Sequence, residues 1–239
     1  MLNAGVYLGL GTLVIVGLLE LKNKNNVKNI ISYYGRQKYL EAWYHTIINS
    51  IVFGPMVYQI VSENFLDSQN HPKKDPIVTS TVHISFIIVF HSGGYWYAHS
   101  LMHTRFLWSI HRFHHTYSNY VTPVVAMAVS PMEYIFAYML PFIVASWAVR
   151  PSHLELLISA GIISLCNLII HSPSLDYLSK YIPIWWISPE KHLTHHKRSD
   201  KSHLSAPTFD IDYLIERKNL FFTYNGVDTK NDTNAIRGT

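Results

Sequence analysis

Residues 10–19 read LGTLVIVGLL, and this stretch decides the fold class because it carries no charge and offers no polar face to water. A helix that is apolar all round is buried in a large core or spans a membrane. Four longer apolar stretches extend the pattern along the chain: residues 4–21, 77–98, 132–149 and 154–171. A spanning helix needs about 20 mostly apolar residues. The sequence therefore predicts an all-α, multi-span transmembrane bundle.

A fifth stretch, residues 44–61, is weaker because Asn49, Pro55 and Gln59 interrupt it, so four or five spans are expected. The alternative, a soluble protein with buried core helices, fits the composition poorly. Charged residues make up 14% of the chain, whereas soluble domains average about 25%.

The distribution of Lys and Arg predicts how the bundle is oriented. With five spans, most of the nineteen basic residues fall on one side, in the segment 22–41, the segment 99–120 and the tail after residue 171. Positively charged loops face the cytosol, so this side is expected to be cytosolic, with the N-terminus opposite. If the source is eukaryotic, an endoplasmic-reticulum-type membrane is expected. The pI near 9 needs no nucleic acid to explain it, because the basic residues flank spans and face anionic headgroups.

Eight of the fifteen histidines form three clusters with the spacing of a helical turn. Positions i, i+3 and i+4 lie on one face of a helix, so each cluster is expected to point its imidazoles at one locus. Neutral imidazole is the commonest metal ligand among side chains. The clusters, all on the predicted cytosolic side, are HxxxH at His99 and His103, HxxHH at His111, His114 and His115, and HxxHH at His192, His195 and His196.

His171 is a ninth candidate ligand, because a tight turn at residues 150–152 is expected to return the chain to the same membrane face. Two six-coordinate ions would use about this many nitrogens, whereas one zinc site takes four. The Glu-x-x-His pattern of soluble di-iron bundles is absent from the clusters. A histidine shell without thiolates favours iron, copper, nickel or zinc over magnesium or calcium. The single cysteine, Cys166, lies within a predicted span, which excludes a disulfide.

The other histidines are interpreted separately. His91 lies in HSGG, which is similar to a haem-binding HPGG box, but its place inside a span makes the match accidental. His203 follows the last cluster closely, and whether it is a ligand stays open. The isolated ones, interpreted as ordinary surface or packing residues, are His45, His71, His83 and His153.

The whole chain, residues 1–239, is interpreted as a single membrane domain with a cytosolic helical cap built from the histidine segments. Residues 1–84 form its N-terminal spans and residues 226–239 a polar tail. Ser130 is expected to cap a helix with Pro131 and Glu133 in its first turn. The apolar stretch 121–129 is expected to lie at the membrane surface.

The histidine boxes and the residues around them resemble the fatty acid hydroxylase/sterol desaturase superfamily of membrane-bound di-iron enzymes. YWYAHSLMH at 95–103 is similar to the family's YWxHRxxH, and LWSIHRFHH at 107–115 to its LWxxHxxHH. SPME at 130–133 resembles an HPxE element, and the resemblance covers roughly residues 85–214. The departures from the family pattern are Ser100 for Arg, Ser130 for His, Pro173 for Gly, and Ser202-His203 where Asn-Tyr-Gly is common.

The resemblance implies a catalytic centre of two iron ions held by the histidines, with the eight box residues as the catalytic set. It implies O₂-dependent oxidation of an unactivated C–H bond in a membrane lipid: a fatty acyl chain, a sterol or a long-chain aldehyde. Electrons would come from an external donor of the cytochrome b5 or reductase type. Hydroxylation and desaturation use the same ligands and stay open. The rivals are a catalytically degenerate family member with a structural or lipid-binding role and a metal transporter, although a transporter would place its histidines within the spans.

Overall fold

The computed structural model describes residues 4–66, 75–198 and 203–216. These residues are overwhelmingly helical, and they contain no β-strand, only one isolated bridge between Trp186 and Phe209. The all-α prediction is confirmed. His71 and the polar tail 226–239 lie outside the described residues.

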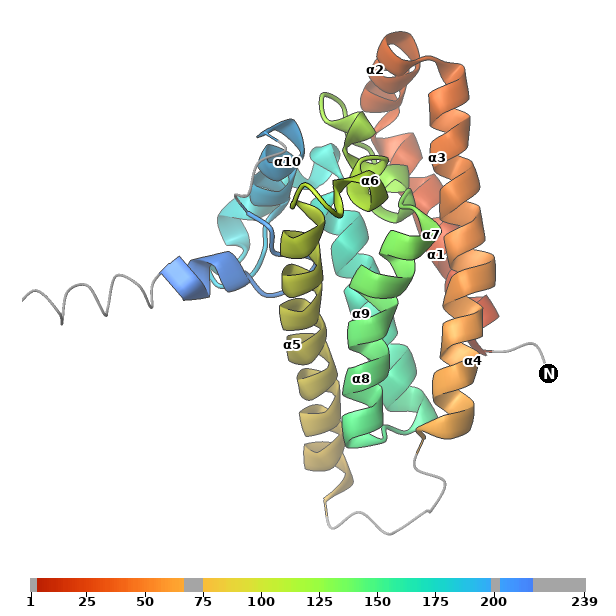
Figure 1. Ribbon diagram of the computed structural model, residues 1–239, viewed down its shortest axis with the longest axis vertical. Helices are drawn as coiled ribbons and strands as arrows, with labels where there is room; N and C mark the ends of the chain where they lie inside the picture. Colours follow the sequence, from red (N-terminus) through yellow and green to blue (C-terminus); the bar gives the residue numbers. More distant parts are fainter. Residues whose placement is uncertain (1–3, 67–74, 199–202, 217–239) are drawn as a thin grey trace, which may run out of the picture.

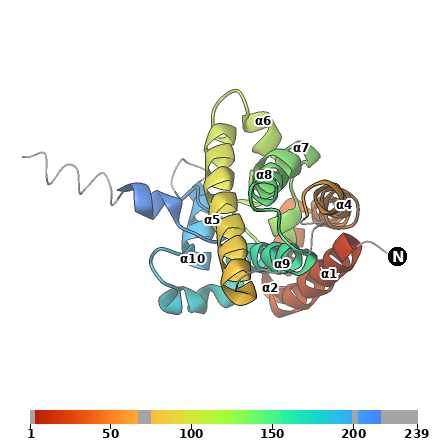
Figure 2. The same cartoon turned by 90° about the horizontal axis from the view of Figure 1, so that it is seen from below.

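Four helical runs among the described residues are long and apolar enough to cross a membrane, as predicted. In the view along the helices, α9 lies between α1 and α5, and α8 lies between α5 and α4 (Figure 2). The four runs are α1 (Ala4–Lys22), α5 (Pro76–Met102), α9 (His153–Ile170), and the series α7 (Pro131–Glu133), η4 (Tyr134–Met139) and α8 (Leu140–Val149).

The predicted fifth stretch is helical and lies alongside the bundle (Figure 1). It is built of α3 (Arg36–Ile48), the π-helical segment η1 (Asn49–Phe53) and α4 (Gly54–Asn64), which follow one another without a break. At 1.5 Å per residue this run is about 43 Å long. Of its polar interruptions, Asn49 is fully buried, whereas Gln59 is half-buried and pairs with Glu63. A fifth span stays a prediction.

A helical cap covers one end of the bundle, where α5 and α9 end (Figure 1). All three histidine clusters lie in or next to this cap, so they share one end of the molecule. The cap consists of α2 (Lys24–Tyr34), α6 (Trp108–His111), η2 (His114–Tyr117), η5 (Pro173–Tyr181) and α10 (Pro189–Arg198), and η3 (Pro123–Met127) lies beneath it.

The apolar stretch 121–129 does not lie at the membrane surface, and that prediction was wrong. Every residue of it is buried, packed between the cap and the spanning helices. Backbone outside a regular α-helix is tolerated at such depth only when its polar groups find partners inside the protein. Here the partners are polar side chains from three different helical runs. Glu20 accepts a hydrogen bond from the Val124 amide, and Thr46 donates one to the Val124 carbonyl. Asn49 donates to the carbonyls of Met127 and Val129, and Asn167 donates to the carbonyl of Ala126.

The predicted turn at residues 150–152 is confirmed. Arg150 ends α8 with a left-handed φ of 48°, and Ser152 begins α9 with a capping box completed by Glu155. Glu155 also accepts a hydrogen bond from Ser80 and pairs with His83, both on α5. This turn lies at the end of the bundle opposite the cap, so α9 runs back to the cap and ends next to His171.

Candidate metal centre

The nine predicted histidines meet in two groups within and beneath the cap. Within each group, the ring nitrogens that could serve as ligands lie within 4.8 Å of one another. His103 is half-buried and the other eight are buried. The first group is His99, His103, His111, His115 and His195; the second is His114, His171, His192 and His196.

The expectation that each cluster serves one locus was wrong for both HxxHH boxes. In each box the first and last histidines join one group and the middle one joins the other. His111 and His115 belong to the first group and His114 to the second, while His192 and His196 belong to the second and His195 to the first. Consecutive residues of a helix point about 100° apart, so the two adjacent histidines of a box diverge. Each HxxHH box therefore bridges the two groups.

The local conformation of the two boxes differs. α10 carries its three histidines on one continuous helix, whereas α6 ends at His111 and a short 3-10 helix carries His114 and His115. The rings of the two groups remain adjacent, with the His111 and His114 ring centroids 5.4 Å apart and those of His115 and His196 5.2 Å apart. Two ions bound here would be close neighbours.

Burial and mutual repulsion keep these imidazoles neutral. Burial lowers the pKa of His171 from 6.5 to about 4. Burial first, and then the neighbouring histidines, lower the pKa values of the other cap histidines further below 6.5. These residues are His111, His114, His115, His192 and His196. Neutral rings keep a lone pair for a metal ion.

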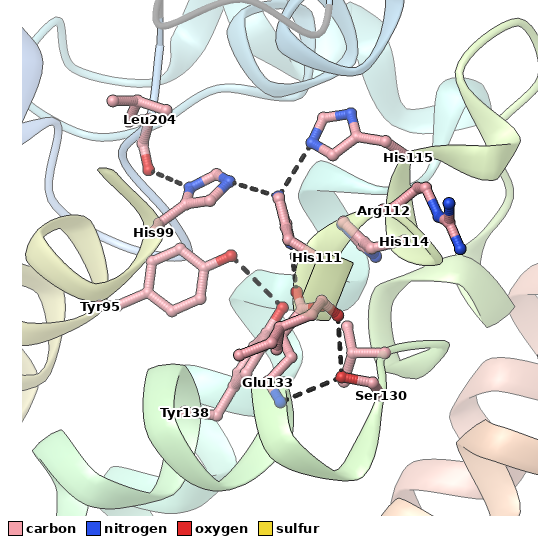
Figure 3. Close-up of polar contacts among 12 residues, drawn as sticks. Tyr95, His99, His111, Arg112, His114, His115, Ser130, Glu133, Tyr138 and Leu204 are labelled. Carbon is pink, nitrogen blue, oxygen red and sulfur yellow. Dashed lines mark hydrogen bonds and ion pairs between the residues drawn. The ribbon is translucent and has the colours of Figure 1, made fainter. Parts of the chain in front are cut away.

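The first group contains one nitrogen contact, between His99 and His111, that no hydrogen bond explains. His99 Nδ1 donates to the Leu204 carbonyl at 2.7 Å, and His111 Nδ1 donates to Glu133 Oε1 at 2.7 Å (Figure 3). In a neutral imidazole the remaining nitrogen is then an acceptor only. The two Nε2 atoms nevertheless lie 2.9 Å apart, and His115 Nε2 is also 2.9 Å from His111 Nε2. Facing lone pairs at this distance repel unless a cation lies between them.

The second group repeats the arrangement around His171. Its Nδ1 donates to the Asn167 carbonyl at 2.7 Å, which leaves Nε2 as an acceptor. That atom lies 2.9 Å from His192 Nε2, 3.3 Å from His196 Nε2 and 3.5 Å from His114 Nε2. Nitrogens bound at about 2.1 Å and at right angles around one ion lie about 3 Å apart. The spacing in both groups is that of ligands around a cation.

The number and kind of donors narrow the choice of metal. A structural zinc site has four protein ligands. The second group could supply four, whereas the first group has five histidines. Imidazole suits iron, copper, nickel and zinc, and octahedral oxygen sites suit magnesium and calcium. The residues present therefore fit transition ions that accept more than four ligands, of which iron is one.

One of the comparisons with known proteins identifies the family of the chain. The model of the fatty acid hydroxylase family matches residues 84–216, which is more than half of the chain. The chain belongs to the fatty acid hydroxylase family. Neither the comparison with curated proteins nor that with solved structures found a match.

Glu133 is the site residue that sequence reasoning missed in this fatty acid hydroxylase family member. Its expected role was in the first turn of a helix capped by Ser130, and the Glu133 amide does donate to Ser130 Oγ at 3.1 Å. The Glu133 side chain, however, turns to His111 and is fully buried (Figure 3). The family's HPxE element, matched here by SPME, was the one signal that could have marked it. The carbonyls of Leu204 and Asn167 carry no sequence signal, because any residue has one.

The other histidines of this family member stand apart from the two groups. His203 has a left-handed φ of 54° and belongs to neither group. His45 packs against Phe113, and His83 pairs with Glu155. His91 is buried in the middle of the bundle, below the metal centre. Of the histidines that the structure describes, only the nine predicted ones gather in groups that could hold metal.

Proposed function

We propose that the protein is a membrane-bound, O₂-dependent di-iron oxidoreductase that hydroxylates or desaturates a membrane lipid. The observation that carries this proposal is the pair of adjacent, buried all-histidine groups in a member of the fatty acid hydroxylase family. One ion would be held by the five histidines of the first group and the other by the four of the second. When bound, iron at these positions supplies the one-electron redox chemistry that activates O₂ toward a C–H bond.

The protein's own residues set the conditions for this chemistry. Glu133 accepts a hydrogen bond from His111 Nδ1, and the Leu204 carbonyl accepts one from His99 Nδ1, which fixes the tautomer and the orientation of each ring. Glu133 also places a buried carboxyl group next to the first group. Burial of the histidines keeps bulk water away from the centre, which protects a reactive oxidant from side reactions.

Hydroxylation converts a C–H bond and O₂, with two electrons and two protons, into an alcohol and one water. Desaturation uses the same inputs, removes two hydrogens from neighbouring carbons and yields two waters. We propose that the electrons come from an external donor of the cytochrome b5 or reductase type. On the charge distribution, we propose that the cap and its histidines face the cytosol.

Lipid mass spectrometry in a host of defined lipid composition tests the proposal. With the wild-type chain and a donor system, we expect a new lipid species 16 mass units heavier or 2 units lighter. His195→Ala and His114→Ala remove one ligand from the first and the second group respectively, and each variant is expected to abolish the product and lower the bound metal. His153→Ala, an exposed histidine far from the cap, serves as the matched control and should leave the product unchanged. An unaltered lipid profile with every donor would favour the non-catalytic family member.

A further inference from the structure

A cavity of about 80 Å³ lies in the middle of the bundle, beneath the metal centre. Its walls come from α1, α4, α5, α8, α9, η3 and the π-helical segments η1 and η4, so it lies at membrane depth rather than in the cap. On α9 its lining runs from Ala160 to Asn167, which is about 10 Å of helix. Asn167 is one turn, about 6 Å, before His171. The upper end of the cavity therefore lies directly below the second histidine group.

The shape of the cavity suits a single extended chain. A small volume spread over about 10 Å of helix leaves room for the width of one hydrocarbon chain and not for a fused ring system. Close helix contact keeps the walls together, because a Cβ at Gly9 would meet the backbone of Ser50. Among the described residues that line it, none carries a formal charge, so an anionic headgroup would be buried without a counterion.

Four buried polar atoms of the lining have no hydrogen-bond partner among the described residues: Ser50 Oγ, Tyr58 Oη, His91 Nδ1 and Asn167 Oδ1. Each of these side chains is at most 4% exposed. An unsatisfied buried polar group costs about 1–3 kcal/mol, and native structures contain few of them. Four around one cavity indicate that the cavity receives a ligand with polar atoms of its own.

The unpartnered atoms define what that ligand must offer. Asn167 Oδ1 can only accept a hydrogen bond. His91 Nδ1 has no partner either, and it can donate or accept, depending on which ring nitrogen carries the proton. One acceptor, Asn167 Oδ1, therefore lacks a donor, and three groups, on Ser50, Tyr58 and His91, can act either way. A carbonyl oxygen cannot donate, whereas a hydroxyl group both donates and accepts.

The edge of the cavity faces the bilayer. Most of its lining is buried, but Leu8 on α1 and Ala160 and Ser164 on α9 are half-exposed on the outer surface of the bundle. This surface belongs to two spanning helices, so a chain could enter sideways from the membrane without crossing water.

From this geometry we propose that the cavity binds an uncharged aliphatic chain that carries a hydroxyl group, such as a long-chain alcohol, and holds it beneath the two histidine groups. This proposal rests on the proposed function and narrows its substrate class. It requires no new chemistry, because the cavity binds and orients the chain.

Photolabelling tests the site directly. The full chain in phosphatidylcholine nanodiscs is exposed to hexadecanol bearing a diazirine in its chain, and labelled peptides are mapped by mass spectrometry. We expect labels on the cavity-facing parts of α1, α4 and α9. Unlabelled hexadecanol should compete about three- to tenfold better than hexadecane, the gain from one to two hydrogen bonds. In His91→Leu, which removes one of the unpartnered polar atoms, this preference should shrink while hexadecane competes as before.

A matched pair of variants separates the cavity from the lipid-facing surface. Ser164→Phe places a ring at the half-exposed edge of the cavity and should reduce labelling at least tenfold. Leu165→Phe, at the next position and 45% exposed, should leave labelling unchanged. Equal labelling in both variants, labels outside the cavity, or equal competition by hexadecane would overturn the proposal.

Metal content, measured on the same samples, distinguishes the two proposals. It should be the same in Ser164→Phe as in the wild type, which shows that the bundle folds. Cavity labelling in a wild-type protein that binds no metal would refute the proposed function and leave this inference standing. Two bound ions and lipid oxidation without cavity labelling would refute this inference alone.

Discussion

At the scale of single residues, Glu133 shows how a buried acid supports a metal ligand. Its Oε1 lies 2.7 Å from His111 Nδ1, and both side chains are fully buried. A carboxylate here fixes the ring and makes its other nitrogen a better ligand. Nδ1 of His111 then carries the proton, and Nε2, which faces the proposed metal position, carries none.

Glu133→Gln is expected to weaken metal binding at the first histidine group by about 10- to 100-fold, the usual effect of losing such a partner. The second group, held by other partners, should keep its ion. Chelator titration of the metal-loaded protein measures both sites. Glu41→Gln, a surface carboxylate paired with Lys38, is the control. Identical chelator curves for the two variants would show that Glu133 does not support His111.

The nine histidines could be predicted from the sequence, whereas their division between two groups could not. Residue type and spacing show that imidazoles gather, and the turn before α9 shows that His171 joins them. The division depends on the direction of each ring, since neighbours such as His114 and His115 point about 100° apart. Nothing in an HxxHH pattern says which of its members turns to which ion.

At the scale of elements, the stretch 121–129 shows the limit of hydropathy. An apolar run without helical pattern next to a membrane protein's cap suggests a surface segment. Its burial depends on polar side chains far away in sequence, above all Asn49, which donates to two of its carbonyls. Asn49 was interpreted only as an interruption of a span. In the structure it is one of four side chains that satisfy the segment's backbone and let it lie inside the bundle.

Asn49→Ala is expected to destabilise the protein by about 2 kcal/mol or more, because two buried carbonyls lose their donor. For a chain of this size that corresponds to a fall in melting temperature of roughly 5 °C or more. Thermal unfolding of the purified protein in detergent measures the effect. Asn64→Ala removes a comparable side-chain bond at an exposed helix end and should change the melting temperature by much less. A similar shift in both variants would count against the structural role given to Asn49.

At the scale of the whole molecule, the bundle places every histidine cluster at one end and the turn at 150–152 at the other. Four spans and the shared end were predictable, because span length and the number of crossings decide which loops lie together. The direction of the bundle in the membrane rests on the charge distribution alone.

Cysteine labelling in sealed, oriented vesicles tests that direction. In a Cys166→Ala background, Asp176→Cys marks the cap and His153→Cys marks the opposite end; both positions are exposed. An impermeant maleimide should label Asp176→Cys from the cytosolic side and His153→Cys from the other side. The reverse pattern would show that the cap faces away from the cytosol. Labelling of both cysteines from the same side would refute the prediction that α9 crosses the membrane.

The central claim, that the two histidine groups hold two metal ions, predicts the number of ions bound per chain. Elemental analysis of the full chain, purified from cells supplied with iron, should find close to two iron ions per chain, because the groups offer five and four neutral imidazoles. Loss of His195 or His114 should lower that content. A wild-type protein that folds and binds one ion, or none, would contradict the account.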